Sequence, residues 1–159
     1  MIIVPDSSAL IALSICDSLW LLERLFGEVK IPPAVFHEVI QHGKPQSQSL
    51  RSYCEGKITA VKLNPVQLEK AKGLGRGELE AIALYLELSA ELLLIDDAKA
   101  RKIAVLNYLE VMGSLGVLLL AKQEHLVERI SPLIASLNAS NIYLSQRLIT
   151  QALELAGET

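Results

Sequence analysis

Short runs of large aliphatic residues, each followed by aspartate, constrain the fold of this chain more than any other feature of its sequence. Ile2-Ile3-Val4 opens the chain, and a matching run covers Leu92 to Ile95. Such uninterrupted runs are typical of strands that are buried on both faces. Segments of helical periodicity separate them from weaker strand candidates at Glu28 to Ile31, Ile58 to Leu63 and Glu110 to Met112. Strands that alternate with helices predict a three-layer α/β/α fold, with a small parallel sheet flanked by helices.

Proline, serine and glycine mark the expected helix boundaries. The prolines predict helices over about 32–42 and 64–73, because proline is favoured in the first turn of a helix. Ser145 and Gly157 predict the two ends of a final helix. The chain is therefore expected to be rich in helix.

Length and composition fit one compact unit. The chain has 159 residues, of which 51% are hydrophobic and 21% charged. A chain of this kind can bury a core without disulfides or structural metals, so we expect a single domain over residues 1–159. Two cysteines are too few for a disulfide framework, and no apolar run approaches the ~18 residues of a membrane span. No signal peptide is visible, so a cytoplasmic location is expected.

Three of the four aspartates follow the two strongest strand candidates. Asp6 comes after the first run, and Asp96-Asp97 come directly after the second. In an open parallel sheet, ligands bind outside the carboxyl ends of the strands, so these side chains are expected to lie near one another. Carboxylates that repel each other need a cation to stay ionised side by side. The alternative is that Asp6 and Asp97 only cap the following helices, a role for which aspartate is preferred.

Two helical segments add candidate glutamates. Glu38 borders an apolar stripe, which predicts a carboxylate that is at least half buried, although a solvated glutamate fits the pattern equally well. Glu78 and Glu80, in GRGELEAIALYLEL, point to nearly opposite sides of a helix, so only one can face the site. Glu78 is followed at helical spacing by apolar residues and is the inward candidate. Glu80 shares its side with other glutamates and is expected in water.

Several catalytic motifs are excluded by spacing. The zincin pattern fails because the second histidine falls five residues after His37 instead of four. The glycine-rich stretch 73–77 lacks the Lys-Ser/Thr of a phosphate loop and is expected to be a flexible connector. No nucleophilic Cys-His or Ser-His arrangement is evident. The acids remain as oxygen ligands, which suit Mg²⁺ or Mn²⁺ better than zinc.

Five segments, in their order along the chain, resemble the PIN domain family, and more narrowly its prokaryotic branch related to VapC-type toxins. They are VPDSSALIAL, PAVFHEVI, GRGELEAIAL, LLLIDDAKAR and EVMGSLGVLLLAK. The resemblance covers nearly the whole chain, with about 124–159 as a C-terminal helical extension of the same domain. It implies a parallel sheet flanked by helices, with an acidic metal pocket at the sheet edge.

The resemblance also implies a role for each acid. The catalytic acids and metal ligands would be Asp6, Glu38, Glu78 and Asp96. Asp97 would be an additional or alternate ligand, and Ser7 or Ser8 would supply the hydroxyl beside the first aspartate. Glu80 is a reserve for Glu78, because Glu80-Ala81 copies the acid-alanine dipeptide that is common in the family.

Together these features predict a Mg²⁺- or Mn²⁺-dependent endoribonuclease that leaves 3′-hydroxyl and 5′-phosphate ends, as the family implies. The net charge of −3 shows no basic surface, so RNA contacts are expected from a small basic cluster that includes Lys99 and Arg101, and from Ser7 and Ser8 beside the first aspartate. The alternative functions are a catalytically inactive PIN-like module that binds RNA or protein, and a metal-dependent phosphatase. The resemblance to toxins implies a small antitoxin partner and a homodimer, with no membrane association. The apolar SLGVLLLAK segment is a candidate subunit interface, although core packing explains it at least as well.

Overall fold

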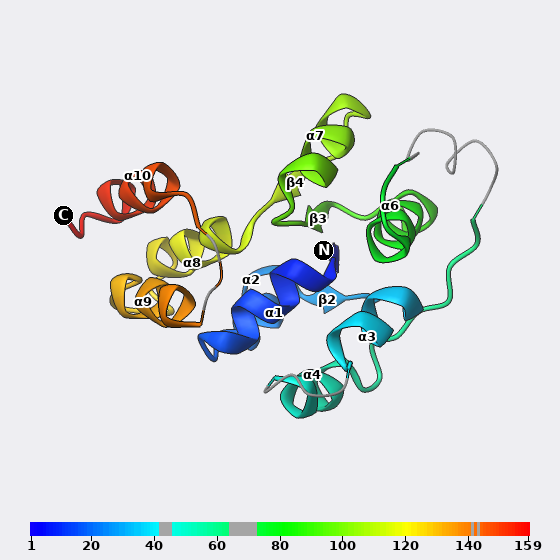
Figure 1. Cartoon of the computed structure of the whole chain (residues 1–159), viewed down its shortest axis with the longest axis horizontal. Coiled ribbons are helices and arrows are strands. Elements are labelled where there is room, and N and C mark those ends of the chain that lie inside the picture. The colour runs from blue at the N-terminus through cyan, green and yellow to red at the C-terminus, as the bar shows by residue number, and fades with distance from the viewer. Residues whose placement is uncertain (42–45, 64–72, 141, 143) are drawn as a thin grey trace.

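In a computed structural model, which describes residues 1–41, 46–63, 73–140, 142 and 144–159, four strands form one sheet in the order β2-β1-β3-β4 (Figure 1). The strands are β1 (Ile2–Pro5), β2 (Glu28–Val29), β3 (Leu92–Leu94) and β4 (Val111–Met112). All three pairings are parallel, and the register places Ile3 opposite Val29 and Leu92, and Leu93 opposite Val111. The parallel sheet predicted from the alternating pattern is therefore confirmed.

The weaker strand candidates form less sheet than their sequences predict. The segment after Val29 contributes only an isolated parallel bridge between Ile31 and Ile58, and no named strand covers the rest of 58–63. Ile58 is 44% exposed, so this run lies at the margin of the sheet and is not buried on two faces.

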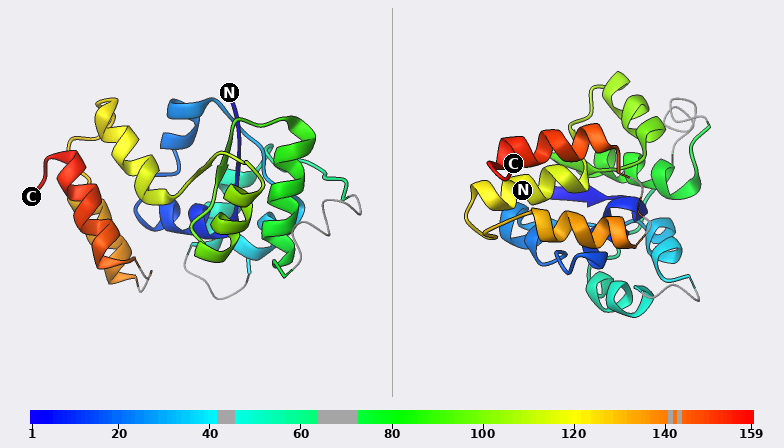
Figure 2. Two further views of the ribbon diagram at one scale, coloured as in Figure 1. Left: turned by 90° about the horizontal axis from the view of Figure 1, so that it is seen from above. Right: turned by 60° about the vertical axis from the view of Figure 1, so that its left-hand side comes forward.

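Helices precede and follow the strands along the chain. They are α1 (Ser7–Ile15), α2 (Leu21–Phe26), α3 (Pro33–Val39), α4 (Ser47–Cys54), α6 (Arg76–Leu88), α7 (Ala98–Leu106), α8 (Ser114–Gln123), α9 (Ser131–Ala139) and α10 (Gln146–Ala156). α6 packs against β1 and β3, α2 against β2, and α7 against β4. Helices flank the central sheet on both sides, which gives the expected three-layer α/β/α architecture (Figure 2).

The helix boundaries predicted from the sequence agree with the structure at some positions and differ from it at others. The final helix has Ser145 and Gly157 at its two caps, as predicted, and Gly157 adopts the left-handed conformation that ends many helices. α3 begins at Pro33 but ends at Val39, short of the expected end near position 42, which lies outside the described residues. The helix predicted over 64–73 lies outside them as well, except for its last residue. The expectation of a flexible connector over 73–77 is wrong at its end, because α6 begins at Arg76.

The C-terminal helices share the core of the sheet. Buried side chains of Ile134 in α9 and Ile149 in α10 belong to the same hydrophobic cluster as Ile3 and Leu93. In α8, Val117 and Leu118 are buried in that cluster, so core packing accounts for part of the apolar SLGVLLLAK segment. Within the ranges that the structure describes, no helix is both long enough and apolar enough to span a bilayer.

Candidate functional site

Asp6 and Asp96 meet at the carboxyl edge of the sheet, immediately beyond β1 and β3. The Asp6 N–H donates to the Leu94 carbonyl at 2.8 Å, which extends the strand pairing by one bond. The Ser8 hydroxyl joins the two aspartates, because it donates to Asp6 Oδ1 at 2.7 Å and accepts from the Asp96 N–H at 3.3 Å. The convergence expected from parallel strand ends is therefore present.

Asp6 is a buried carboxylate among other carboxylates. Only 2% of the residue is exposed, and Oδ1 also accepts from the Ala9 N–H at 3.1 Å, which caps α1. The pKa of Asp6 is raised to about 7, chiefly by burial and also by the negative charges of Asp96 and Glu78, although the hydrogen bonds from Ser8 and Ala9 act to lower it. Asp96 and Glu78 therefore lie close enough to Asp6 to act on its carboxylate.

Asp96 is held by the start of α8. Its Oδ1 accepts from the Ser114 N–H at 2.7 Å. A Cβ at Gly113 would lie 2.7 Å from that oxygen and 3.4 Å from an Arg101 nitrogen, so this contact requires glycine at position 113. Asp96 thus occupies the amino end of a helix, where the helix dipole favours negative charge.

Glu38 reaches the same edge from α3 and is partly buried, which agrees with the first of the two interpretations that its sequence pattern left open. Its Oε2 accepts from the Ser7 hydroxyl at 2.6 Å, and its Oε1 accepts from the Gly77 N–H at 3.1 Å. A Cβ at Gly77 would overlap the Glu38 carboxylate, so glycine is required there too. Ser7 begins α1 and Gly77 lies in the first turn of α6, so Glu38 links three helices.

The two glutamates of α6 have different environments. Glu78 Oε2 accepts from the Gly75 N–H at 2.8 Å, where it satisfies an unpaired donor at the helix start. The expectation that Glu80 lies in water is wrong, because its side chain is only 7% exposed. Glu80 Oε1 accepts from the Ala34 N–H at 3.0 Å and its Oε2 from Arg76 Nε at 2.7 Å. The periodicity of one helix could not show that the start of α3 covers this flank.

The remaining candidates lie on or beside α7. Asp97 is exposed and its Oδ2 accepts from the Ala100 N–H at 2.8 Å, so it caps α7 as the alternative interpretation proposed. Lys99 is exposed and donates from Nζ to the Gly73 carbonyl at 2.9 Å. Arg101 lines a hollow together with Asp96 and Asp97.

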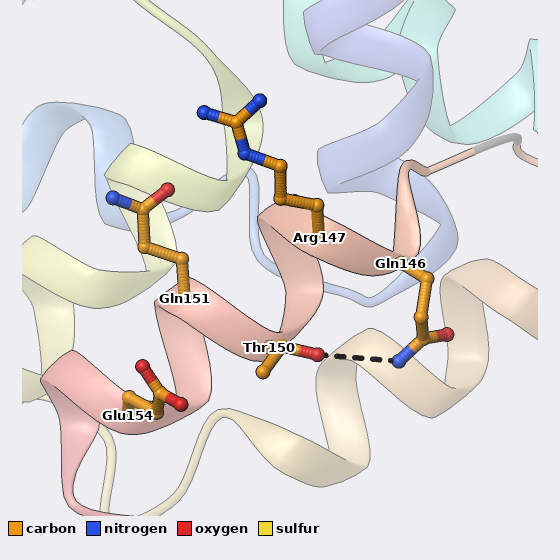
Figure 3. Close-up of a pocket in the computed structure, with 5 residues that line it drawn as sticks. All are labelled: Gln146, Arg147, Thr150, Gln151 and Glu154. Atoms are coloured by element: carbon orange, nitrogen blue, oxygen red, sulfur yellow. Dashed lines mark hydrogen bonds between the residues drawn. The ribbon is translucent and has the colours of Figure 1, made fainter.

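That hollow has a volume of about 830 Å³. It extends from the carboxyl edge of the sheet where Asp6 and Asp96 lie, called the acidic edge below, to the C-terminal helices. Ser8, Asp96, Asp97 and Arg101 are among its polar lining residues, while apolar side chains from β4, α8 and α10 form most of its walls, including Met112, Leu115, Leu119, Leu148 and Leu155. A separate hollow of about 460 Å³ on α10 is lined by polar side chains, among them Gln146, Arg147 and Glu154, and includes none of the candidate acids (Figure 3).

Every candidate acid accepts a hydrogen bond from a backbone N–H at a helix start, which satisfies part of the need of each carboxylate for donors. Asp6 accepts from α1, Glu78 from the start of α6, Asp96 from α8 and Asp97 from α7. Among the described residues, no three His, Cys, Asp or Glu side chains are arranged to hold a metal ion together as they stand. The donor set of carboxylate and hydroxyl oxygens nevertheless suits Mg²⁺ or Mn²⁺.

Gly77, Gly113 and Ser114 were not singled out from the sequence, although each contacts a candidate acid. The sequence does hold one sign of this role: a glycine lies at or just before the start of a predicted helix, close in sequence to a candidate acid. Such glycines allow a side chain to approach the backbone closely.

Comparison with known proteins supplies one match. A family model described as a PIN domain matches residues 2–158. No curated protein matches the chain significantly.

Proposed function

Because the chain belongs to the PIN domain family, a nuclease-type fold, we propose that it is a metal-dependent endoribonuclease. The observation that carries this proposal is the meeting of Asp6 and Asp96 through Ser8 at the carboxyl edge of the sheet, with Glu38 bonded to the neighbouring Ser7. Glu78 lies near enough to help raise the pKa of Asp6. No lysine or arginine among the described residues forms an ion pair with Asp6. A buried carboxylate in this position favours a bound cation.

We propose Asp6, Glu38, Glu78 and Asp96 as the ligands of Mg²⁺ or Mn²⁺. Glu78 is preferred to Glu80, whose two oxygens both accept from groups outside the acidic cluster. Asp96 is preferred to Asp97, which is an exposed helix cap and remains an additional or alternate ligand. When bound, the metal would activate water and stabilise the charge that develops on a phosphodiester.

Within that site, two serines would orient the ligands. Ser8 donates to the Asp6 carboxylate and accepts from the Asp96 N–H, so it would orient Asp6 relative to the second strand end. Ser7 directs Glu38 through its hydroxyl. Arg101, which lines the hollow beside Asp96, and the exposed Lys99 would contact backbone phosphates of the RNA.

The test is cleavage of RNA by the purified protein with Mg²⁺ or Mn²⁺, with EDTA as the control. Fragments with 3′-hydroxyl and 5′-phosphate ends are expected only in the presence of the metal. Cleavage that persists in EDTA would contradict the metal-dependent mechanism.

The alternative function is a catalytically inactive PIN-like module that binds RNA or protein. It is favoured by the arrangement of the acids, which already accept hydrogen bonds at helix starts and do not form a ready group of three ligands. Calorimetric titration of the folded protein with Mn²⁺ separates the two functions. Absence of binding would support the inactive module.

We propose further that the chain acts in the cytoplasm as a homodimer with a small antitoxin protein as partner. The support is the apolar wall of the large hollow, where Leu148 and Leu155 are 46% and 64% exposed. A dimer is expected in light scattering of the purified protein, and a monomer would contradict it.

Residues 1–159 are proposed to form one domain, supported by the shared core, so a single unfolding transition is expected.

A further inference from the structure

Two hydrogen bonds that mirror each other join α3 and α6. Glu80 of α6 accepts from the N–H of Ala34, the second residue of α3, at 3.0 Å. Glu38 of α3 accepts from the N–H of Gly77, the second residue of α6, at 3.1 Å. N–H groups in the first turn of a helix have no helical partner. Each helix therefore supplies the carboxylate that satisfies the start of the other.

The spacing of these residues couples the two bonds. Ala34 and Glu38 are four residues apart on α3, and Gly77 and Glu80 are three apart on α6, so each pair lies on one helix face. The faces meet where α3 and α6 pack together, as they do side by side in Figure 1. One bond fixes the amino end of α3, and the other lies one turn further along that helix. Loss of the first therefore loosens the second.

Glu80 is well placed for this role. Its side chain is 7% exposed, and its second oxygen accepts from Arg76 Nε at 2.7 Å, while the Arg76 side chain is 66% exposed. A buried carboxylate persists in a fold when charge and hydrogen-bond partners satisfy it. Both oxygens of Glu80 have such partners, and neither partner belongs to the candidate metal ligands.

We propose that Glu80 is a positioning residue, whose carboxylate holds the first turn of α3 against α6 and thereby places Glu38 in the candidate site. The placement of Glu38 stands on the geometry alone. Its consequence for metal affinity rests on the proposed function. Residues that orient metal ligands typically change metal affinity by about 10- to 100-fold when they are replaced.

Two substitutions at position 80 separate the effect of side-chain length from the effect of side-chain charge. Glu80→Asp keeps the charge but is one methylene shorter, so its carboxylate withdraws from the Ala34 N–H. Glu80→Gln keeps the length and an oxygen that can accept from Ala34, but it loses the charge, while exposed Arg76 can turn to water. Glu87→Asp, at an exposed position on the same helix, is the matched control.

The first measurement is amide hydrogen exchange in the metal-free proteins, which does not depend on the proposed function. In Glu80→Asp, faster exchange is expected at Ala34 and also at Gly77, whose N–H donates to Glu38. In Glu80→Gln and in the Glu87→Asp control, both amides stay protected. Unchanged exchange at Gly77 in a folded Glu80→Asp protein would overturn the proposed positioning.

The second measurement is Mn²⁺ titration of the same proteins, at a temperature where melting curves show each to be folded. About tenfold weaker binding is expected for Glu80→Asp, and nearly native binding for Glu80→Gln. The reverse order would show that the Glu80 charge acts as a metal ligand, and would overturn the proposal. If the native protein binds no Mn²⁺, the proposed function fails, while the exchange measurement still decides whether Glu80 positions Glu38.

Discussion

Two buried carboxylates, Asp6 at the sheet edge and Glu158 near the C-terminus, differ in the sign of the charge beside them, which separates a candidate site from a structural contact. Asp6 is 2% exposed, and the Glu158 side chain is 5% exposed. Both accept from backbone N–H groups at the start of a helix, Asp6 in α1 and Glu158 at α9. Glu158 also accepts from Lys122 Nζ at 2.8 Å, whereas the charged neighbours of Asp6 include Asp96 and Glu78.

The pKa values of the two groups move in opposite directions. Burial, together with the smaller effect of the nearby carboxylates, raises the pKa of Asp6 to about 7. Burial also acts to raise the pKa of Glu158, but Lys122 and the backbone N–H groups outweigh it and hold the pKa at about 2. A helix start alone therefore does not offset the cost of burying a charge. Glu158 stabilises the fold, while ionised Asp6 costs folding free energy, as expected of a functional group.

The largest expected effect comes from Asp6→Asn, which sharpens the comparison by separating activity from stability. Loss of a ligand charge should remove several kcal/mol of transition-state stabilisation, or about 10³-fold in cleavage rate. The same change removes a buried negative charge and keeps an oxygen that can accept from Ser8 and Ala9. In EDTA at pH 7, stability should therefore rise by on the order of 3 kcal/mol. Cleavage assays and melting curves measure the two effects.

Asp17→Asn is the control for that variant, because Asp17 is exposed and its positive φ of 52° suits asparagine equally well. It should change neither cleavage nor the melting temperature. A melting temperature that falls in Asp6→Asn would mean that Asp6, like Glu158, is chiefly a structural cap.

A smaller loss is expected from Gly77→Ala, which tests the placement of Glu38. A Cβ at position 77 overlaps the Glu38 carboxylate, so Glu38 must leave the Gly77 N–H. We expect about 10- to 100-fold weaker Mn²⁺ binding by calorimetry, as for other changes that disturb ligand orientation. Alanine has a better helix propensity than glycine, by about 1 kcal/mol, which limits the cost to folding. Native Mn²⁺ affinity in this variant would show that Glu38 is not a ligand.

The sequence predicts the frame of this site better than its internal bonds. The runs at Ile2 and Leu92 are short and are separated by segments of helical periodicity, which predicts buried parallel strands. The ends of those strands then place Asp6 and Asp96 together. Glu80 was misplaced because helical periodicity describes one helix, while its burial depends on α3, which is distant in sequence. The role of Gly77 was missed for the same reason, since the Glu38 carboxylate that it accommodates comes from another helix.

Glu158→Gln tests the structural half of the comparison and should cost about 1–2 kcal/mol at pH 7, because charged hydrogen bonds become neutral ones. Glu154→Gln, on the exposed face of α10, is the control.

Because the pKa of Glu158 is lowered, its contribution to the free energy of unfolding is complete above the unfolded value near 4.5 and disappears as the pH falls toward 2. The stability difference between Asp6→Asn and the native protein should instead grow as the pH rises from about 4 to 7. Melting curves across this range would contradict the comparison if both differences had the same pH dependence.

The smallest effect is expected from Arg101→Ala. This variant tests whether a lysine or arginine side chain of the protein itself neutralises the carboxylates at the acidic edge. Arg101 lines the hollow beside Asp96 and Asp97, yet it forms no ion pair with a carboxylate in the described part of the chain. Under the proposed function, its guanidinium contacts an RNA phosphate. Its loss should weaken RNA binding severalfold and reduce the slope of log affinity against log salt by about 1.

Arg147→Ala is the matched control, because Arg147 lies on α10 and lines the separate polar hollow, whose lining includes none of the candidate acids (Figure 3). Binding of the two variants to labelled RNA is compared at several salt concentrations with the metal held constant. An unchanged salt slope in Arg101→Ala, together with stronger Mn²⁺ binding, would indicate that Arg101 competes with the metal for the carboxylates. Asp6 and Glu158 would then differ less than their contacts suggest, because each would lie near a protein cation. A reduced slope of log RNA affinity against log salt, with unchanged Mn²⁺ binding, would instead mean that Arg101 contacts RNA and that the metal neutralises the carboxylates at the acidic edge.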